Sequence, residues 1–206
     1  MIALLLFAAL QPGGDATTTD SAHAPILRNP QPVVRYTDYP DQSLRNGEAG
    51  IVSLLLHVSP QGRATSCDVT ETSGFPHLDA GTCQLFKARA RFNPATDAQG
   101  APTTGFYRSV VAWGVGDDQP RIGETVPLYV SALPERYEQP VTMELLFDKS
   151  GHGTQCTVKT SSGNGGADRA ACAYLTKNYS ITPPKSRSAD VEPAAVRYIT
   201  ASFEVK

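Results

Sequence analysis

Apolar residues alternate with other residues in two well-separated segments of this chain. Every second side chain is apolar from 52 to 58 and again from 141 to 147. Because successive side chains of a strand point to opposite faces, each segment is predicted to be a strand with one buried face. A turn with Pro, Asp or Gly residues follows each strand, at 59–62 and 148–151, and predicts a hairpin to a second strand.

A helix and a further strand are predicted after each hairpin. The second strand ends at a Ser-Gly pair, Ser73-Gly74 in one segment and Ser162-Gly163 in the other. The elements that follow have these approximate bounds: helices at 78–89 and 167–177, and last strands at 104–113 and 195–205. The predicted fold class is therefore α+β, built from two tandem strand-strand-helix-strand units.

The two segments are copies of one unit. When the sequence is shifted by 89 positions, identical residues align without gaps from the first strand to the end of the helix. The identical pairs include Val52 and Val141, Leu56 and Leu145, Gly62 and Gly151, Cys67 and Cys156, Asp79 and Asp168, Cys83 and Cys172, and Pro94 and Pro183. The hydrophobic pattern between these positions is also preserved, which supports a tandem repeat.

Segments without hydrophobic periodicity flank and separate the two units. The expected organisation is a signal peptide or leader at 1–24, a flexible segment at 25–38, the first unit at 39–113, a linker at 114–126 and the second, degenerate unit at 127–206.

The leader contains an apolar run from Ile2 to Leu10. This run has the length of the hydrophobic part of a signal peptide and is too short to span a membrane, which takes about 20 residues. No Lys or Arg precedes it, so a disordered cytosolic leader is the alternative. Export is favoured, because an even number of regularly spaced cysteines is typical of a chain oxidised outside the cytosol.

The repeat selects one pairing of the four cysteines. Each unit carries one cysteine on its second strand and one on the core side of its helix, 16 positions apart. Of the three possible pairings, we therefore expect two strand-to-helix disulfides, Cys67 with Cys83 and Cys156 with Cys172. Reduced buried thiols and a metal site are the alternatives, although the chain has neither a Cys-x-x-Cys motif nor closely spaced ligand pairs.

Charge and motifs argue against nucleic-acid binding and catalysis. The chain has 18 Lys and Arg against 20 Asp and Glu, and no basic run that could follow a nucleic-acid backbone. Its four histidines are scattered, and no hydrolase, metalloprotease or phosphate-loop motif occurs. We expect a protein that is not an enzyme, with no catalytic residues, no metal site and no cofactor.

The first unit resembles the C-terminal domain of the TonB family. The resemblance rests on an ordered set of motifs: Tyr39-Pro40, Leu44 to Gly50, Val58 to Arg63, Thr72-Ser73-Gly74, Leu78-Asp79 and Arg91 to Ala95. It covers about residues 39 to 113. The second unit keeps Ser162-Gly163, Asp168 and Pro183 but lacks the Tyr-Pro opening, so it is a degenerate copy.

The resemblance implies a periplasmic protein that binds an envelope partner and is associated with transmembrane transport. In that family the last strand of the domain offers its edge to a short segment of an outer-membrane receptor by strand addition. Transferred by position, the partner-binding residues are Gly105, Phe106, Tyr107, Val110, Val111 and Trp113. Any association with the inner membrane is expected only through partners or an uncleaved leader.

A closed structural or scaffold protein of the envelope is the alternative. In this arrangement the two units pair their last strands with each other, so that no strand edge stays free. Protection of the backbone amides in 105–113 from solvent distinguishes the two hypotheses.

Overall fold

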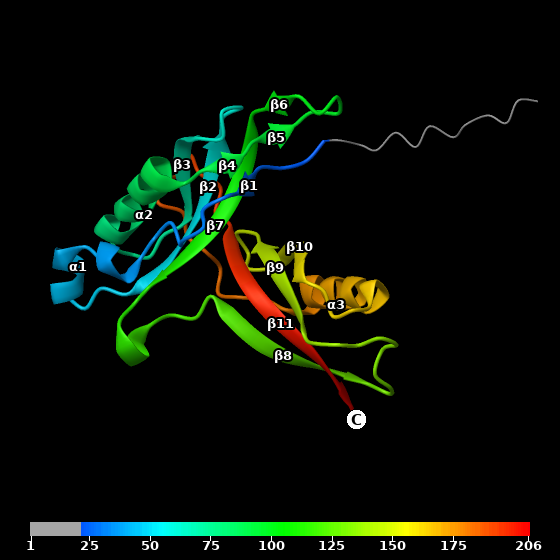
Figure 1. The fold of residues 1–206 in the computed structure, drawn as a ribbon. Helices are drawn as coiled ribbons and strands as arrows, with labels where there is room; N and C mark the ends of the chain where they lie inside the picture. Colours follow the sequence, from blue (N-terminus) through cyan, green and yellow to red (C-terminus); the bar gives the residue numbers. More distant parts are fainter. Residues whose placement is uncertain (1–21) are drawn as a thin grey trace, which may run out of the picture.

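Two α+β units follow one another in the computed structural model, which describes residues 22–206 and confirms the predicted fold class. The first unit contains an antiparallel sheet of order β3-β2-β7, formed by β2 (Gly50–Val58), β3 (Ala64–Glu71) and β7 (Gly105–Trp113). Helix α2 (Pro76–Arg89) packs on one face of this sheet (Figure 1).

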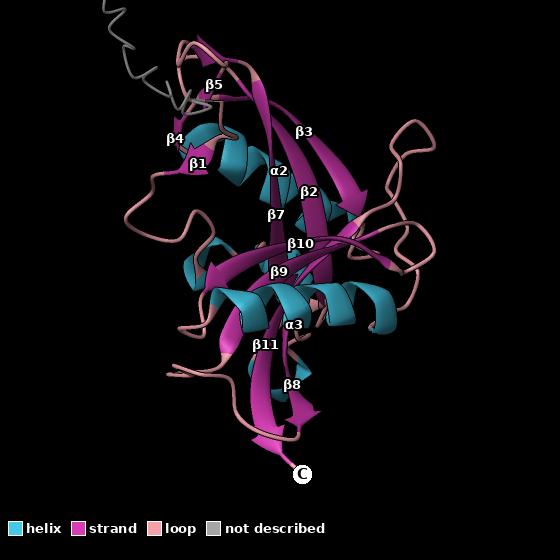
Figure 2. Cartoon of the chain, turned by 90° about the vertical axis from the view of Figure 1, so that its right-hand side faces the viewer, coloured by secondary structure: helices cyan, strands magenta, loops and turns pink. Residues whose placement is uncertain are grey.

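The second unit repeats this arrangement and adds one strand. β9 (Val141–Phe147), β10 (Gly153–Thr160) and β11 (Ala195–Val205) correspond to β2, β3 and β7, and helix α3 (Gly165–Asn178) packs on them. The added strand, β8 (Gly123–Val130), lies parallel to β11, so the sheet order is β10-β9-β11-β8. Figure 2 shows α3 in front of this second sheet, with the first unit above it.

Short elements complete the first unit and the connection between the units. Two small ribbons are formed by β1 (Ile26–Leu27) with β4 (Phe92–Asn93), and by β5 (Ala95–Thr96) with β6 (Pro102–Thr103). The remaining helices are short: η1 (Tyr36–Asp38), α1 (Asp41–Arg45) and η2 (Gly116–Asp118).

The alternating strands supply both hydrophobic cores. The side chains predicted to face inward are fully buried, namely Val52, Leu54, Leu56 and Val58 in β2 and Val141, Met143, Leu145 and Phe147 in β9. The β9 side chains cluster with Leu175 of α3, and those of β2 cluster with Phe86 of α2, except that Val52 clusters with Leu78 of the same helix. Each large side chain buried in this way stabilises its unit by about 1.5–3 kcal/mol.

Each unit contains the disulfide that the sequence predicts. Cys67–Cys83 joins β3 to α2 and Cys156–Cys172 joins β10 to α3, with Cα atoms 5.7 and 5.6 Å apart. No cysteine in residues 22–206 is free, so the alternatives of reduced thiols and a cysteine metal site are wrong. Closing loops of this length stabilises each unit by about 3 kcal/mol in the chain-entropy account.

The glycines shared by the copies close the two hairpins. Gly62 and Gly151 have φ angles of 71° and 78°. A Cβ added to either would lie 2.1 Å from a carbonyl oxygen, that of Phe92 or of Ile181. Only glycine fits this close approach and this backbone conformation, which explains why both copies carry it.

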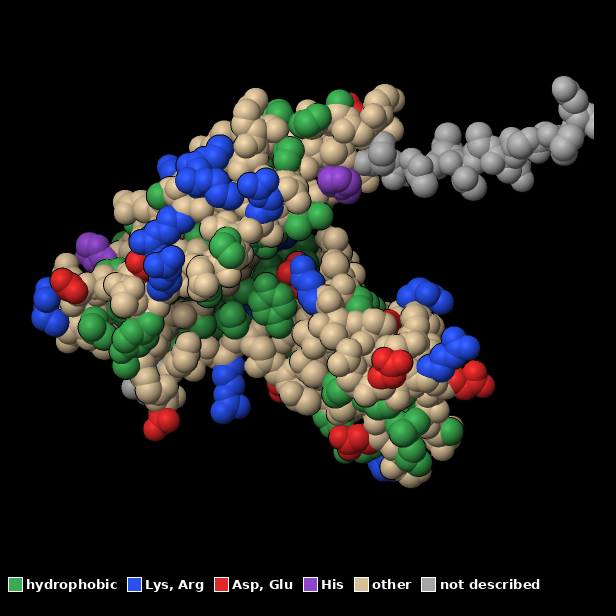
Figure 3. Space-filling view, viewed as in Figure 1, with side chains coloured by type: hydrophobic (Ala, Val, Ile, Leu, Met, Phe, Trp, Pro, Cys, Tyr) green, Lys and Arg blue, Asp and Glu red, His purple; other side chains and the backbone are tan. Residues whose placement is uncertain are grey.

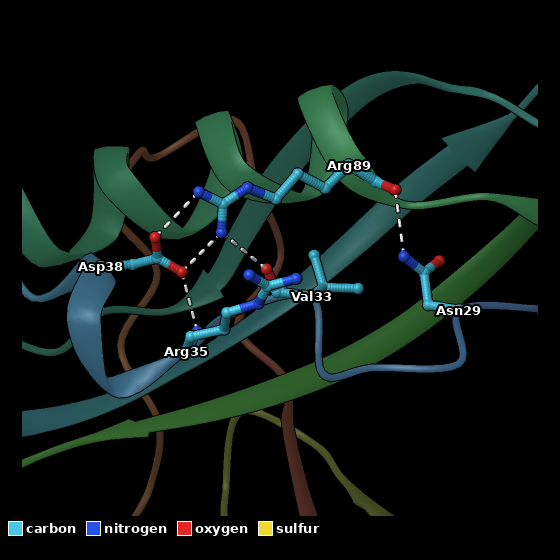
Figure 4. Close-up of polar contacts among 5 residues, drawn as sticks. All are labelled: Asn29, Val33, Arg35, Asp38 and Arg89. Atoms are coloured by element: carbon cyan, nitrogen blue, oxygen red, sulfur yellow. Dashed lines mark hydrogen bonds and ion pairs between the residues drawn. The ribbon is translucent and has the colours of Figure 1, made fainter.

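The segment 25–38, which the sequence predicted to be flexible, is held against the first unit; we call it the strap. Val33 is only 5% exposed, within the core beside α2. Arg89 donates two hydrogen bonds to the carboxylate of Asp38, at 2.5 and 2.8 Å, and Asn29 donates to the carbonyl oxygen of Arg89 at 3.1 Å (Figure 4). Helix α2 therefore supplies hydrogen-bond partners near both ends of the strap.

The expected linker at 114–126 overlaps the start of β8. Residues 123–126 belong to β8. They are ordered there because Val126, together with Leu128 and Val130, packs against the core of the second unit.

The second unit covers the C-terminal end of the outer edge of β3. The backbone N–H of Thr72 donates to the carbonyl oxygen of Lys185 at 2.8 Å, and the N–H of Ala194 donates to that of Thr70 at 3.0 Å. The segment between α3 and β11 therefore lies against this end of β3 and joins the two units.

The expected signal peptide lies almost wholly outside the described residues. Within 22–206, none of the helices has the length and hydrophobicity needed to cross a membrane.

Candidate functional site

β7 is an edge strand with a regular ladder. It pairs with β2 over nine residues, from Gly105 opposite Val58 to Trp113 opposite Gly50, without a bulge. Among residues 22–206, β2 is the only strand that pairs with it. The edge is about 30 Å long. A strand edge of this kind offers a row of N–H and C=O groups to an added strand.

Alternate residues of β7 direct their backbone groups to the open edge. At the preceding hairpin the N–H of Ser59 donates to the carbonyl oxygen of Arg63. Odd-numbered residues of β2 therefore bond toward β3, and even-numbered residues bond toward β7. Their register partners in β7 are the odd-numbered residues. The backbone groups that face outward belong to the even-numbered residues, which are Phe106, Arg108, Val110 and Ala112.

The side chain of Trp113 closes the core rather than facing a partner. It is 3% exposed, and its Nε1 donates to Oγ1 of Thr82 in α2 at 2.8 Å. The ring of Tyr39 meets it edge to face, with centroids 5.2 Å apart. Trp113 therefore holds the C-terminal end of β7 against α2.

Tyr107 and Val111 also lie on the side of the sheet that α2 covers. Both are half-buried and pack against the first core. The ring of Tyr107 lies 5.0 Å from that of Phe92. Only the outer parts of these side chains can reach an added strand.

The opposite face of β7 carries Phe106 and Val110, whereas Gly105 lies on the same face as Tyr107. Phe106 is 58% exposed and meets the ring of His57 edge to face at 4.6 Å. Val110 is only 8% exposed, because β11 crosses this face of the sheet. Gly105 lies where an added Cβ would come within 2.8 Å of Ala95 and Pro25. The large apolar side chain presented to solvent at this edge is therefore Phe106.

A partly desolvated hollow adjoins β7 on the side of the second unit. Burial lowers the pKa of Arg108. Burial, and then the charge of Glu144, raises the pKa of Tyr107. Burial, Glu144 and Tyr107 together raise the pKa of Tyr198 in β11 to about 12. Figure 3 shows hydrophobic side chains gathered in the hollow between the units, below β7. Both tyrosines are thus neutral hydrogen-bond donors at ordinary pH.

A second hollow separates the units away from β7. It is a cleft of about 1260 Å³ whose lining includes Glu71, Arg121, Lys185 and Arg197. No group of three or more His, Cys, Asp or Glu side chains within residues 22–206 is arranged to hold a metal ion.

One feature of the second unit escaped sequence reasoning. Tyr137 meets Phe203 edge to face at 5.5 Å, as Tyr39 meets Trp113 in the first unit. The second unit therefore replaces the missing Tyr-Pro opening with a tyrosine at a different offset. The signal for it was the aromatic residue before β9, but the gap-free shift of 89 positions could not align it.

Comparison with known proteins identifies one family. Residues 35–112 match the family described as Gram-negative bacterial TonB protein C-terminal. The matched segment runs from the strap through β7, and it does not extend into the second unit. No curated protein matches the chain.

Proposed function

We propose, starting from the membership of the first unit in the TonB C-terminal family, that this is a non-enzymatic periplasmic protein that captures an envelope protein. The captured element is an extended segment that adds to the open edge of β7. The partner is an envelope protein of the kind that TonB-dependent outer-membrane receptors represent. The role of the captured complex is associated with transport across the outer membrane. Backbone hydrogen bonds supply the affinity of such a contact, and the side chains beside the edge supply selectivity.

The observation that carries this proposal is the difference between β7 and the other strand edges. The end of β3 is bonded to the second unit, where Val69 and Thr70 accept hydrogen bonds from Arg187 and Ala194, and its pairing with β2 has two register shifts. β10 is interrupted by two register shifts, and bulges of this kind discourage pairing. β8 contains Pro127, which lacks a donor. Within the described residues, β7 alone among these four offers nine regular positions without a bulge or proline.

The hypothesis of a closed protein with paired last strands is not supported by the topology. β11 pairs with β8 and β9, whereas β7 pairs with β2. The last strands are therefore in separate sheets, and the alternative is corrected on this point.

The two disulfides support the proposed location. Such bonds persist in oxidising compartments, of which the bacterial periplasm is one. We also propose that an export signal lies within 1–24, and that the first and second units form the binding and companion parts of the protein.

Replacement of an outward-facing residue of β7 by proline tests the function. Val110→Pro removes one outward donor without removing a β2 ladder bond. The matched control is Val158→Pro, which places the same ring on β10, the open edge strand of the other sheet. Both variants, with parent-like circular dichroism, are compared for capture of a TonB-dependent receptor from envelope extract.

The proposal expects Val110→Pro to lose capture and Val158→Pro to retain it. Equal capture by parent and folded Val110→Pro would exclude β7 as the binding edge. Equal loss in both variants would show that capture reports general destabilisation instead.

A further inference from the structure

The outer edge of β11 is the counterpart of the outer edge of β7. Each strand is the last of its unit, and each pairs antiparallel with the first strand, β11 with β9 and β7 with β2. Each carries an aromatic residue, Trp113 or Phe203, that meets a tyrosine edge to face. If strand addition occurs at β7, the second unit has an edge of the same kind.

In this structure the chain itself occupies that second edge. β8 pairs in parallel with β11 over eight positions, from Gly123 opposite Tyr198 to Val130 opposite Val205. Val196 precedes Tyr198 in β11 and lies beyond the start of the pairing with β8. Its N–H donates to the hydroxyl of Ser53 in the first unit at 3.2 Å. The outward groups of β11 are therefore used, whereas no strand in residues 22–206 uses those of β7.

β8 is added to a sheet that already has counterparts of all three strands of the first sheet. The three-stranded sheet and the long helix of the first unit all have counterparts in the second, whereas β8 has no counterpart in the sheet of the first unit. β8 contributes three half-buried side chains, Val126, Leu128 and Val130, while its remaining residues are exposed or glycine. In β9, by contrast, every second residue is buried. β8 thus contacts the core from its margin, as a bound segment would.

Hydrogen bonds show which side of β8 is in use. The N–H of Tyr198 donates to the carbonyl oxygen of Ile122 at 2.8 Å, and the N–H of Lys206 donates to that of Val130 at 3.2 Å. In a parallel ladder alternate residues bond to one neighbour, so the even-numbered residues of β8 bond to β11. Pro127 lies at an outward position, where its missing donor costs no bond with β11. β8 can therefore pair with the edge of β11. Its own outer edge lacks the donor of Pro127 and is a poor partner for a further strand.

We propose that β8 is a built-in ligand strand, which fills the strand-binding edge of the second unit. The chain accordingly has two edges of one kind, an open one on β7 and a self-occupied one on β11. Release of β8 uncovers the second edge without unfolding the unit. The inference rests on the proposed function in one respect: it assumes that the edges of β7 and β11 bind a partner by strand addition.

Hydrogen exchange of the intact chain tests the release of β8 directly. Even-numbered amides of β11, such as Tyr198 and Thr200, bond to β8, whereas odd-numbered amides, such as Ile199 and Ala201, bond to β9. If β8 detaches as a unit, the even-numbered amides exchange at least about tenfold faster than the odd-numbered ones. Equal rates, set by unfolding of the whole unit, would overturn the proposal.

A complementation experiment tests whether the uncovered edge binds a strand. The variant Val126→Asp with Leu128→Asp places two charges against the core margin and releases β8. Its even-numbered β11 amides should lose protection while α3 and β9 stay protected. A free peptide of residues 122–131 should restore that protection, and the same peptide with both Asp substitutions should not.

Three results of this experiment overturn the proposal. Loss of protection throughout α3 and β9 would make β8 an integral strand of the core. Failure of the parent peptide to restore protection, or restoration by the substituted peptide, would show that β11 has no selective strand-binding edge. These readouts concern β11 alone, so they are independent of receptor capture at β7, which the Val110→Pro comparison decides.

Discussion

The backbone N–H of Val196 donates to the hydroxyl of Ser53, although the two residues are 143 positions apart in the chain. Ser53 is fully buried and donates in turn to Glu71 at 2.6 Å, and Glu71 accepts two hydrogen bonds from Arg197, at 2.8 and 2.6 Å. One continuous polar network therefore joins β2 and β3 of the first unit to the start of β11. This network is expected to couple the stabilities of the two units, while each unit keeps its own core.

Arg197→Met should uncouple them. It leaves the Glu71 carboxylate largely buried without its cation, a change that costs about 3–5 kcal/mol for buried pairs. Thermal unfolding should become less cooperative, with the two units melting separately. The double variant Glu71→Met with Arg197→Met removes both charges and should recover most of the loss. Parent-like stability of the single variant would show that the ion pair does not join the units.

Each disulfide should stabilise its own unit. The paired change Cys67→Ser with Cys83→Ser is expected to cost about 2–5 kcal/mol. Hydrogen exchange should show the loss in β3 and α2, which this bond joins, more strongly than in β10 and α3. The paired change Cys156→Ser with Cys172→Ser is the matched control and should give the reverse pattern. The same loss across both units in both variants would contradict separate local roles.

Acid should weaken the start of α3 through Asp168. Burial raises the pKa of this carboxyl, but hydrogen bonds from Ser161 and Ser162 outweigh burial and leave the pKa below 3.8. A lowered pKa means that the stabilisation is complete above pH 3.8 and is lost as the pH falls through the lower folded-state value.

Asp168→Asn should therefore cost about 1.5–3 kcal/mol at neutral pH and flatten the acid dependence of the second unit as the pH falls below 3.8. Asp190→Asn, at an exposed position of the same unit, is the control and should leave that dependence intact. Denaturant unfolding at several pH values measures both. An unchanged acid dependence in Asp168→Asn would contradict this assignment.

The strap should detach when its ion pair is removed. The hydrogen bond from Arg89 is the main cause that holds the pKa of Asp38 below 3.8, so Arg89→Gln should raise that pKa, as NMR titration would show. Trypsin should then cleave after Arg28 and Arg35 faster than in the parent. Arg45→Gln, at an exposed site in α1, is the control. Unchanged cleavage in Arg89→Gln would mean that β1 and Val33 alone hold the strap.

The repeat made the fold and the disulfides predictable, because identity at a constant offset marks equivalent positions. Cys67 and Cys156 align in this way, and so do Asp79 and Asp168, whose carboxylates both receive hydrogen bonds from the Ser-Gly turn before the helix. The motifs that resemble the TonB C-terminal family likewise placed β7 as the last strand of the first unit.

Other features depend on contacts that no local pattern announces. The strap has no periodicity, yet Val33 reaches the core and Asp38 reaches Arg89, 51 positions away. β8 alternates apolar residues over a few positions only, and its partner β11 lies at the opposite end of the second unit. Side-chain direction was also hidden, so Val111 and Trp113 were expected to face a partner although they pack toward α2.

Amide exchange along β7, with and without a bound receptor segment, tests the central claim most directly. In the free protein the N–H groups of the even-numbered residues, Phe106, Arg108, Val110 and Ala112, should exchange quickly, while those of Tyr107, Ser109 and Val111 are protected by β2. Binding of the receptor segment should slow the even-numbered set and leave the odd-numbered set nearly unchanged. Binding without added protection at the even-numbered amides would contradict strand addition to β7.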